Sequence, residues 1–538
     1  MHIRIRGLVA ALAVALLGAS LVVTAPASAT PQGPTVPDLS WQPCGPAFPG
    51  VECAKALVPL DYDDPTGERT TLQLARIPAA DQANRLGSLF INPGGPGGSA
   101  VALVLFAGQF YADRLQGRFD IVGFDPRGVL LSDPLQCFDT NEEEAEFFAS
   151  QPVFPYLPQQ ERPFFDAYNE FTARCLTHGG DIRPHMSTAD VARDMDLLRR
   201  AVGDQRLSYL GLSYGSFLGN TYANLFPDRI RALVIDGVLD PRAWAAGAHI
   251  VYDRTSAQEV LEEFFRLCDE AGRPDCAFAG PEASQARYER LAEHLLAQPI
   301  VLPDGLYTYD LLIADSVGAM YSTFSWPDFA VFLDFLAAAS EGAATGDQAG
   351  AARAALHDKL TAAQDDRSLY FNGFDAYFGN HCSDAEYPAR FPTWSDVGRR
   401  AEAASRSGPF WWWFNAPCAS WPTAEDRYTG PWTARTSGPV LVVGNYFDPA
   451  TNYRGAVVNS QLLPNSRLLS YAGWGHTAYG LSECATAAMD AYLLDGTLPA
   501  RGTVCPANPN PFEAATDRSG GSPRQVGLPP PWLLRPTA

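Results

Sequence analysis

Positive charge is scarce in this 538-residue sequence, which contains only two lysines, Lys55 and Lys359. Its 39 lysines and arginines are outnumbered by 60 aspartates and glutamates, which gives a formal net charge of −21. A chain this acidic is repelled by nucleic acid and by anionic lipid surfaces. Both are therefore excluded as expected partners, and a small molecule or a peptide is expected instead.

The motifs that hold metals and phosphates are also missing. There is no CxxC pair and no HExxH sequence, so the common zinc-binding patterns are excluded. The glycine-rich stretch "NPGGPGGS" lacks both the Lys-Ser/Thr of a P-loop and the GxGxxG spacing of dinucleotide-binding proteins. No metal and no cofactor is expected.

Long apolar runs are confined to the N-terminus. Residues 1–29 contain three basic side chains, then the stretch "GLVAALAVALLGASLVV", then the small-residue site "ASA" ending at Ala29. This order is typical of a cleaved signal peptide, with a retained membrane anchor as the alternative. No later run is long enough to span a bilayer. Cleavage after Ala29 would take the formal charge from −21 to −23 and leave an extracellular protein, possible attachment to the cell envelope being left open.

Ten cysteines are present, and in an exported protein an even number indicates disulfides. Sequence alone does not fix their connectivity. Their positions suggest pairing between neighbours along the chain: Cys44 with Cys53, Cys137 with Cys175, Cys268 with Cys276, Cys382 with Cys418, and Cys484 with Cys505.

Short apolar segments rich in β-formers alternate with helical stretches. The expected strands are near 72–77, 87–95, 119–128, 207–213, 232–237, 439–445 and 467–473, and the clearest helix begins at a predicted cap, Thr188. This alternation predicts an α/β fold whose mostly parallel sheet is covered by helices on both faces. In such a sheet the reactive loops follow the carboxyl ends of the strands.

The strand rhythm stops between 241 and 430, where helical patterns and the aromatic run "PFWWWFNAPCASWP" take over. A separate helical domain is the alternative, but the later strands would then have no sheet to join. We therefore expect a helical cap at 241–430, inserted between core segments 30–240 and 431–505. A smaller excursion is expected at 138–187, and a loosely held tail at 506–538.

Ser213 lies where one predicted strand gives way to a helix, in the sequence "GLSYG". Glycines at 211 and 215 suit a turn that strains its central residue and brings strand and helix close together. This is the Gly-x-Ser-x-Gly pattern of a nucleophile elbow, although the pentapeptide alone also occurs in ordinary turns.

A serine nucleophile needs a base and a group that orients the base. In sheet hydrolases with this elbow the chain order is serine, acid, histidine. His476, in "GWGHTAYG", and Asp448, in "GNYFDPAT", follow predicted strands in that order. Asp236 and Asp240 compete for the role of the acid. Asp448 is favoured because the 28 residues that separate it from His476 can hold one helix and one strand.

The glycine loop supplies the remaining element. Gly94, Gly95 and Gly97 keep exposed backbone N–H groups just after the end of a predicted strand, and Ser213 also lies just after such an end. We predict that the N–H of Gly95 and that of Tyr214, the residue after the nucleophile, form an oxyanion hole.

Together, "NPGGPGGS", "VGFDPRG", "STADVARDMDLLRRAVG", the 35 residues 207–241 around Ser213, "GNYFDPAT" and "GWGHTAYG" resemble the secreted tripeptidyl aminopeptidases of actinomycetes, α/β-hydrolases related to proline iminopeptidases. The resemblance covers roughly 40–505. It implies release of tripeptides from free N-termini, with Ser213, Asp448 and His476 as the triad. One departure is "DPRGVLLSDP", which has Leu130 where the family has a further glycine, so a different loop shape is expected there.

An aminopeptidase must also recognise a charged α-ammonium, most simply with carboxylates at a fixed distance from the serine. The candidates are Asp384 and the run "NEEEAE", that is Glu142, Glu143, Glu144 and Glu146; a solvated acidic surface is the alternative for each. The run from Trp411 to Phe414, Trp412 above all, is expected either to line substrate pockets or to pack inside the cap.

Two other functions remain open from the sequence. A carboxylesterase or lipase would use the same triad on an ester, and a secreted binding protein could keep the fold without catalysis. Peptides with free N-termini are the expected partners. Nothing specifies the oligomeric state, for which a monomer is the default expectation.

Overall fold

The structure, a computed structural model, describes residues 33–361 and 370–513. The predicted signal peptide lies outside these residues. Within them, no helix is long and apolar enough to cross a membrane.

A ten-stranded sheet organises the described chain, in the order β1-β2-β3-β5-β4-β6-β7-β10-β11-β12. Neighbours from β5 to β12 pair in parallel, while β1, β2 and β3 form an antiparallel edge. Its strands are β1 (Gln42–Pro43), β2 (Glu52–Pro59), β3 (Arg69–Ile77), β4 (Gly87–Asn92), β5 (Phe119–Phe124), β6 (Leu207–Leu212), β7 (Ile230–Asp236), β10 (Val440–Phe447), β11 (Ser466–Trp474) and β12 (Val504–Cys505). The seven strands predicted from apolar runs are all present.

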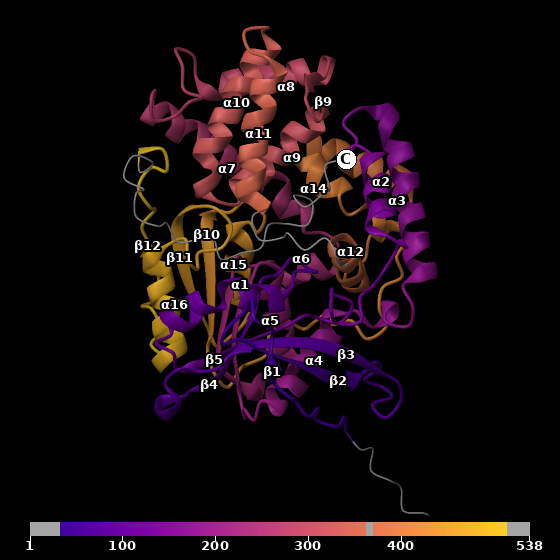
Figure 1. The fold of residues 1–538 in the computed structure, drawn as a ribbon, viewed down its shortest axis with the longest axis vertical. Helices are drawn as coiled ribbons and strands as arrows, with labels where there is room; N and C mark the ends of the chain where they lie inside the picture. The colour runs from indigo at the N-terminus through magenta and orange to yellow at the C-terminus, as the bar shows by residue number, and fades with distance from the viewer. Residues whose placement is uncertain (1–32, 362–369, 514–538) are drawn as a thin grey trace, which may run out of the picture. The chain divides into compact units, whose positions relative to one another are not determined.

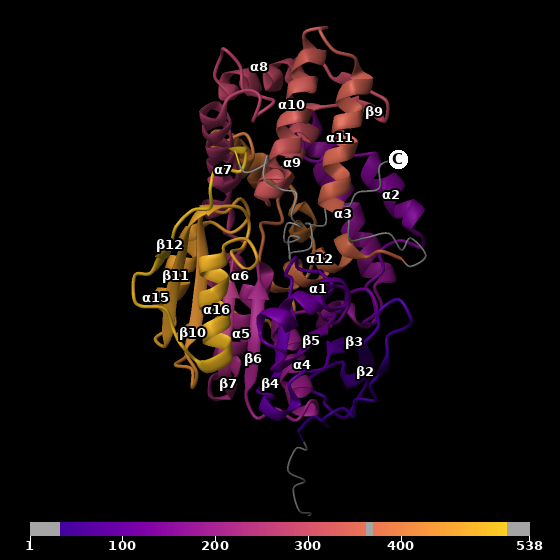
Figure 2. The same cartoon turned by 60° about the vertical axis from the view of Figure 1, so that its left-hand side comes forward.

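Helices cover both faces of this sheet (Figures 1 and 2). Alternate side chains of each central strand enter different cores because the side-chain direction alternates along a strand. On β4, Leu89 and Ile91 join one core and Phe90 the other. The first core contains α1 (Ala100–Arg114) and α16 (Glu483–Asp495), and the second contains α4 (Thr188–Ala201), α5 (Tyr214–Leu225) and α15 (Tyr453–Leu462). This confirms the predicted α/β-hydrolase architecture.

Between β7 and β10 the chain is mainly helical. Its elements are α6 (Pro241–Ala245), α7 (Ile250–Ala271), α8 (Ser284–Ala297), α9 (Tyr309–Met320), α10 (Trp326–Ser340), α11 (Gly346–Thr361), α12 (Gly373–Asp384), α13 (Phe391–Glu402) and α14 (Gly408–Trp413), with a small hairpin of β8 (Ile300–Leu302) and β9 (Gly305–Tyr307) that the sequence did not reveal. The excursion between β5 and α4 holds α2 (Asn141–Ala149) and α3 (Pro158–His178). Figures 1 and 2 both place α7 to α11 at the end of the sheet from which α6 departs.

All five neighbouring cysteine pairs are disulfides: Cys44–Cys53, Cys137–Cys175, Cys268–Cys276, Cys382–Cys418 and Cys484–Cys505. Two join segments that border the helical region. One fixes the start of the α2–α3 excursion to α3, and another fixes α12 to the turn after α14. The pairing inferred from chain positions is thus confirmed.

Two local details differ from the sequence prediction. The cap of α4 is Ser187, whose side chain accepts the Asp190 N–H, while Thr188 is the first helical residue. The start of the predicted tail is packed: Phe512 is fully buried against Phe264 and Trp326. The remainder of that tail, 514–538, lies outside the described residues.

Candidate active site

Ser213 lies at the turn between β6 and α5, with φ 57° and ψ −124°. A non-glycine residue in this left-handed region is strained, and such strain is frequent at catalytic turns. Flanking glycines make the turn possible, because a Cβ on Gly211 would lie 2.3 Å from the carbonyl oxygen of Gly215. The sequence therefore forms the elbow that its spacing predicts.

The glycine loop after β4 packs directly against this turn. A Cβ on Gly94 would lie 2.7 Å from Ser213 Cβ and 2.9 Å from the Tyr214 nitrogen. The Gly94 N–H is occupied by Asn92 Oδ1 at 2.9 Å. The Gly95 N–H has no acceptor in the described part of the chain, and the Tyr214 N–H, at the first position of α5, has none within its helix. The two N–H groups predicted for the oxyanion hole are thus available.

His476 and Asp448 are joined by a hydrogen bond. Nδ1 of His476 lies 2.9 Å from Oδ1 and 3.0 Å from Oδ2 of Asp448. The Asp448 carboxylate is buried and also accepts the Thr451 N–H and hydroxyl, both at 2.8 Å. With Nδ1 protonated and held this way, Nε2 of the neutral ring is the free base.

The serine and histidine loops meet at the end of β7. The Ser213 N–H donates to the carbonyl oxygen of Asp236 at 2.9 Å, and a Cβ on the next residue, Gly237, would lie 3.3 Å from Cε1 of His476. Among the described residues, Ser213 Oγ itself has no hydrogen-bond partner. Such contacts are often long in a free enzyme and tighten in the substrate complex.

The two competing acids have other partners. The Asp236 carboxylate is fully buried and accepts the N–H groups of Ala478 and Tyr479, both at 2.8 Å, so it anchors the loop that carries the histidine. Burial raises the pKa of Asp236 to about 7, although these N–H groups act in the opposite direction. Asp240 caps α6 by accepting the Arg242 N–H at 3.0 Å. Neither acid binds the His476 imidazole.

The helical insertion also holds the histidine. The His476 N–H donates to the carbonyl oxygen of Tyr321, at the end of α9, at 2.8 Å. The Tyr321 ring stands edge-on to the imidazole, with centroids 4.9 Å apart. Position and orientation of the imidazole therefore depend on the insertion as well as on the sheet.

Asp384 does not line the cleft through a free carboxylate. It is 2% exposed, and it accepts the Thr188 N–H at 3.0 Å and the Thr188 hydroxyl. That hydroxyl is also hydrogen-bonded to the hydroxyl of Tyr214. Burial raises the pKa of Asp384 to about 7. Through Thr188, Asp384 is thus linked by hydrogen bonds to Tyr214, the residue that follows Ser213.

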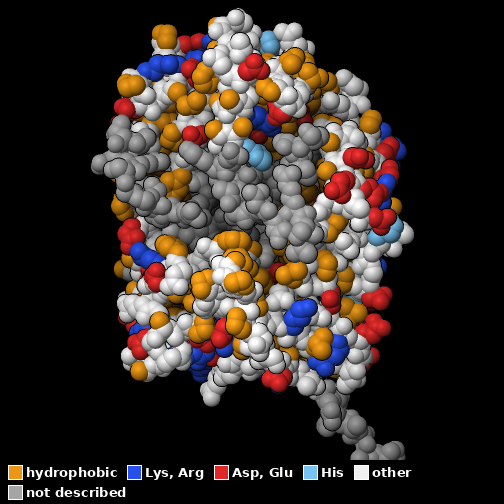
Figure 3. Space-filling model, viewed as in Figure 1, with side chains coloured by type: hydrophobic (Ala, Val, Ile, Leu, Met, Phe, Trp, Pro, Cys, Tyr) orange, Lys and Arg blue, Asp and Glu red, His pale blue; other side chains and the backbone are white. Residues whose placement is uncertain are grey.

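The acidic run forms the first turns of α2, where Figure 3 shows acidic side chains gathered over α2 and α3. Glu142 and Glu146 are exposed, and Glu143 pairs with Arg174 at 2.6 Å. Glu144 is buried, and burial together with the charge of Asp375 raises its pKa to about 9.

The aromatic run packs inside the insertion. Trp412 is 3% exposed, and its ring packs at a tilt against that of Trp394 with centroids 4.2 Å apart. Its Nε1 donates to the Trp394 carbonyl oxygen. Of the two interpretations, substrate pocket or packed core, the burial of this run agrees with a packed core.

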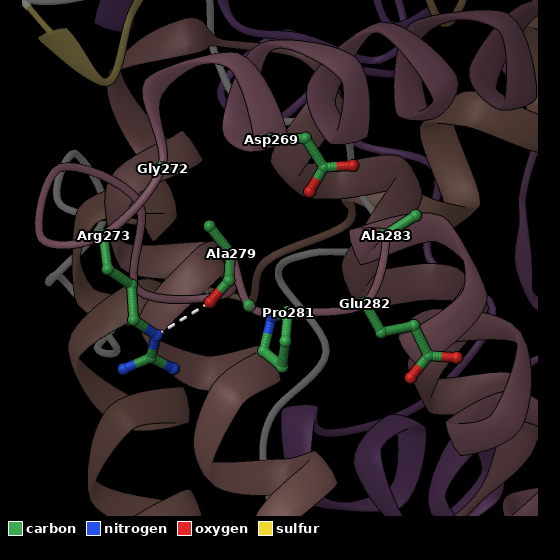
Figure 4. Close-up of a pocket in the computed structure, with 8 residues that line it drawn as sticks. Asp269, Gly272, Arg273, Ala279, Pro281, Glu282 and Ala283 are labelled. Carbon is green, nitrogen blue, oxygen red and sulfur yellow. Dashed lines mark hydrogen bonds between the residues drawn. The ribbon is translucent and has the colours of Figure 1, made fainter.

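A surface hollow of about 450 Å³ lies far along α7, at its loop to α8 (Figure 4). Asp269, Arg273 and Glu282 line it, and Arg273 Nε donates to the Ala279 carbonyl oxygen. It contains no residue of the serine site. The one cluster of metal-ligand geometry in the described chain joins Asp375 to Cys137 and Cys175, whose sulfurs form a disulfide.

Sequence reasoning missed three residues: Tyr321 and Asp253 near the site, and Asp375, a buried acid whose charge raises the pKa of Glu144. Asp253 had a recognisable signal. It occupies the apolar face of α7, in register with Ala257, Val260 and Phe264, where a charged residue is out of pattern. Tyr321 and Asp375 had no such signal, because only the fold brings Tyr321 to His476 and Asp375 to Cys137 and Tyr370.

Comparison with known proteins identifies the family of this chain. Residues 87–252 match the alpha/beta hydrolase fold, and residues 404–505 match the TAP-like protein family. A tripeptidyl aminopeptidase of Streptomyces lividans is 32% identical over 493 aligned positions, covering 88% of this chain and 87% of that protein. The chain belongs to the tripeptidyl aminopeptidase family of α/β-hydrolases.

Two relatives from Mycobacterium tuberculosis carry different names. Serine protease Hip1 is 31% identical over 497 positions, covering 87% of this chain and 91% of that protein. Carboxylesterase B is 32% identical over 504 positions, covering 89% and 92%. The chain is therefore a serine hydrolase of the tripeptidyl aminopeptidase family, and the choice of substrate depends on its own residues.

Proposed function

We propose that this protein is a secreted serine exopeptidase that releases tripeptides from the free N-termini of peptides. The Asp448–His476 hydrogen bond, formed at the edge of the sheet where the strained Ser213 lies, carries the proposal. The predicted signal peptide and the five disulfides support export.

The chemistry follows from this arrangement. Nε2 of His476 takes the hydroxyl proton as Ser213 attacks the scissile carbonyl, and Asp448 stabilises the imidazolium that forms. The oxyanion accepts hydrogen bonds from the N–H groups of Gly95 and Tyr214. His476 then protonates the leaving amine, and water hydrolyses the acyl-enzyme with His476 again as base. Residues 241–430, through Tyr321, act as a cap that completes the site.

The direct test uses a tripeptide anilide with a free N-terminus and the same anilide N-acetylated. The free form is expected to be turned over and the acetylated form to be turned over much more slowly. Ser213→Ala should lower kcat by about four orders of magnitude or more and abolish labelling by a fluorophosphonate probe. Equal turnover of both anilides would refute the exopeptidase proposal, and near-normal turnover by Ser213→Ala would refute the mechanism.

A carboxylesterase is the second candidate, because carboxylesterase B is as similar to this chain as the aminopeptidase is. The same triad would then act on an ester. Short-chain p-nitrophenyl esters hydrolysed with a kcat/KM far above that of any free tripeptide anilide would favour it.

A further inference from the structure

Asp253 is a buried carboxylate on α7 for which the described chain provides no counter-charge. Its residue is 5% exposed, and no hydrogen bond or ion pair involves its side chain among the described residues. Ionising a buried carboxyl without a partner costs free energy, and carboxyls perturbed in this way gather at functional sites, where a cationic ligand can supply the partner.

The position of Asp253 on α7 brings it beside the acid of the triad. Residues three and four apart share one face of a helix. One turn after Asp253, Ser256 accepts a hydrogen bond from Asn452 Nδ2 at 3.3 Å, and Asn452 lies four residues beyond Asp448. One turn before it, the carbonyl oxygen of His249 accepts the Asp253 N–H at 3.1 Å. The face of α7 that carries Asp253 therefore borders the Asp448 loop.

Electrostatic interactions connect Asp253 with several parts of the site. Burial, and then the charge of Asp448, raise its pKa well above the usual range. In turn, the Asp253 charge contributes to raised pKa values of Tyr321, Tyr377 and Tyr387.

Two of these tyrosines contact the catalytic elements themselves. Tyr321 contacts His476, and the Tyr377 nitrogen lies 2.9 Å from where a Cβ on Gly97 of the glycine loop would be. Asp253 thus interacts electrostatically with residues that contact both the base and the glycine loop.

Among the described residues, no neighbouring side chain supplies a cation to Asp253. Arg254, the next residue, is exposed. His249 and His381 are buried, and burial lowers the pKa of His249 to about 4 and that of His381 well below its usual value, so both rings are neutral near pH 7. Tyr387 contacts both rings and adds an aromatic surface of the kind that attracts ammonium groups.

We propose that Asp253 binds the α-ammonium of the peptide substrate and thereby fixes how many residues lie between that ammonium and the scissile bond. This inference rests on the exopeptidase function proposed above. The other acids are less suited: Asp384 is bound to Thr188, and Glu143 to Arg174.

Glu144 and Asp375 are the strongest rival. Burial raises the pKa of Glu144 to about 9 and that of Asp375 to about 7, so both carboxyls, like that of Asp253, need a nearby cation to ionise fully at neutral pH. Asp375 also accepts hydrogen bonds from the Tyr370 hydroxyl at 2.6 Å and the Cys137 N–H at 2.9 Å.

The test compares Asp253→Asn, Asp253→Glu, Glu144→Gln and Glu259→Gln, the last being an exposed carboxylate on the same helix. The readout is the ratio of kcat/KM for a free tripeptide anilide to that for its N-acetyl form. Asp253→Asn should lower this ratio about 30-fold or more, since one partner of a buried ion pair is lost. Glu259→Gln should leave it unchanged. Asp253→Glu should keep a preference for the free form and change the length of peptide released from an unmodified decapeptide.

A binding measurement separates recognition from chemistry. A free tripeptide should raise the Tm of Ser213→Ala but not that of the Ser213→Ala, Asp253→Asn double variant, and without peptide the double variant should be at least as stable because a buried charge is gone. A wild-type ratio in Asp253→Asn, with loss in Glu144→Gln, would overturn the assignment to Asp253. Wild-type enzyme without any preference for the free anilide would instead refute the exopeptidase proposal.

Discussion

The carboxylate of Asp236 accepts the Tyr479 N–H at 2.8 Å, across 243 positions of the chain. Through its own carbonyl oxygen, Asp236 also accepts the Ser213 N–H. One residue at the end of β7 therefore ties the nucleophile turn to the loop that carries His476. We therefore propose Asp236 as a positioning residue, one that acts without a hydrogen bond to the imidazole.

Asp236→Asn should lower kcat while leaving KM nearly unchanged. The N–H groups of Ala478 and Tyr479 both donate to Oδ2 of Asp236, and that of Ala478 also reaches Oδ1 at 3.0 Å. The NH₂ group of an asparagine would oppose one of these N–H donors, so the histidine loop should shift. A displacement of about 1 Å at a catalytic group costs up to about 100-fold in rate. Steady-state kinetics on the free tripeptide anilide checks this. Asp240→Asn, at the cap of α6, is the control, and equal kcat in both variants would contradict the role.

Asp448→Asn should lower kcat about 10⁴-fold, because an amide donor opposite Nδ1 favours the wrong imidazole tautomer. Its buried position between the Thr451 N–H and hydroxyl should keep the fold intact. The measurement is kcat together with the rate of fluorophosphonate labelling, which should fall in parallel. A variant that keeps more than a tenth of wild-type kcat would point to another acid.

Leu130→Gly should stabilise the protein, whereas Leu131→Gly should destabilise it. Leu130 has φ 41°, a left-handed conformation that costs a side chain about 1–2 kcal/mol and costs glycine little. Its N–H donates to Asn372 Oδ1 at 2.9 Å, a contact that glycine retains. Leu131 is exposed and has no positive φ. Urea unfolding should show opposite signs of about 0.5–1 kcal/mol, and destabilisation by both would show that side-chain packing outweighs strain.

Stability should fall as the pH rises from about 4 to 7. Burial raises the pKa of four aspartates to about 7 in the folded protein, namely Asp125, Asp236, Asp375 and Asp384. A raised carboxyl pKa contributes stability that is complete below the unfolded value near 4 and is lost through the folded value.

Two buried histidines act in the opposite direction. The lowered pKa values of His249 and His381 give stability that is present above about 6.5 and is lost at lower pH. The four aspartates outnumber them, so Tm should be higher at pH 5.5 than at pH 8, and Asp236→Asn should reduce the difference. A Tm that rises over this interval would contradict the burial of these carboxyls in protonated form.

Much of the sheet was predictable because its central strands are buried on both faces and therefore read as continuous apolar runs. The disulfides followed from closeness along the chain. The glycines around Ser213 were informative because the tight turn leaves no room for a Cβ at position 211, and this requirement is visible in the local sequence. The family resemblance added the substrate class, which spacing alone did not supply.

Other features depend on contacts between distant segments, and no local pattern encodes those. Strand β2 is antiparallel at the edge of the sheet, with exposed Lys55 and Leu57 that weaken its apolar signal. The carboxylates of the acidic run were proposed because several acidic residues follow one another in the sequence. Burial decides whether a carboxylate needs a partner, and burial becomes visible only in the fold. Asp253 is a single charge on the apolar face of an otherwise ordinary amphipathic helix, α7.

The carbonyl oxygen of Tyr321 belongs to the insertion, yet it accepts the backbone N–H of His476, the residue proposed to move protons at Ser213. Grafting a foreign helical region onto this sheet, in order to change which peptides are accepted, would remove one of the restraints on proton transfer. Attempts to alter selectivity by such exchange should therefore lose turnover number as well, unless the graft supplies an equivalent carbonyl. Because the same helical insertion would affect both substrate selectivity and the position of His476, the two properties are expected to change together.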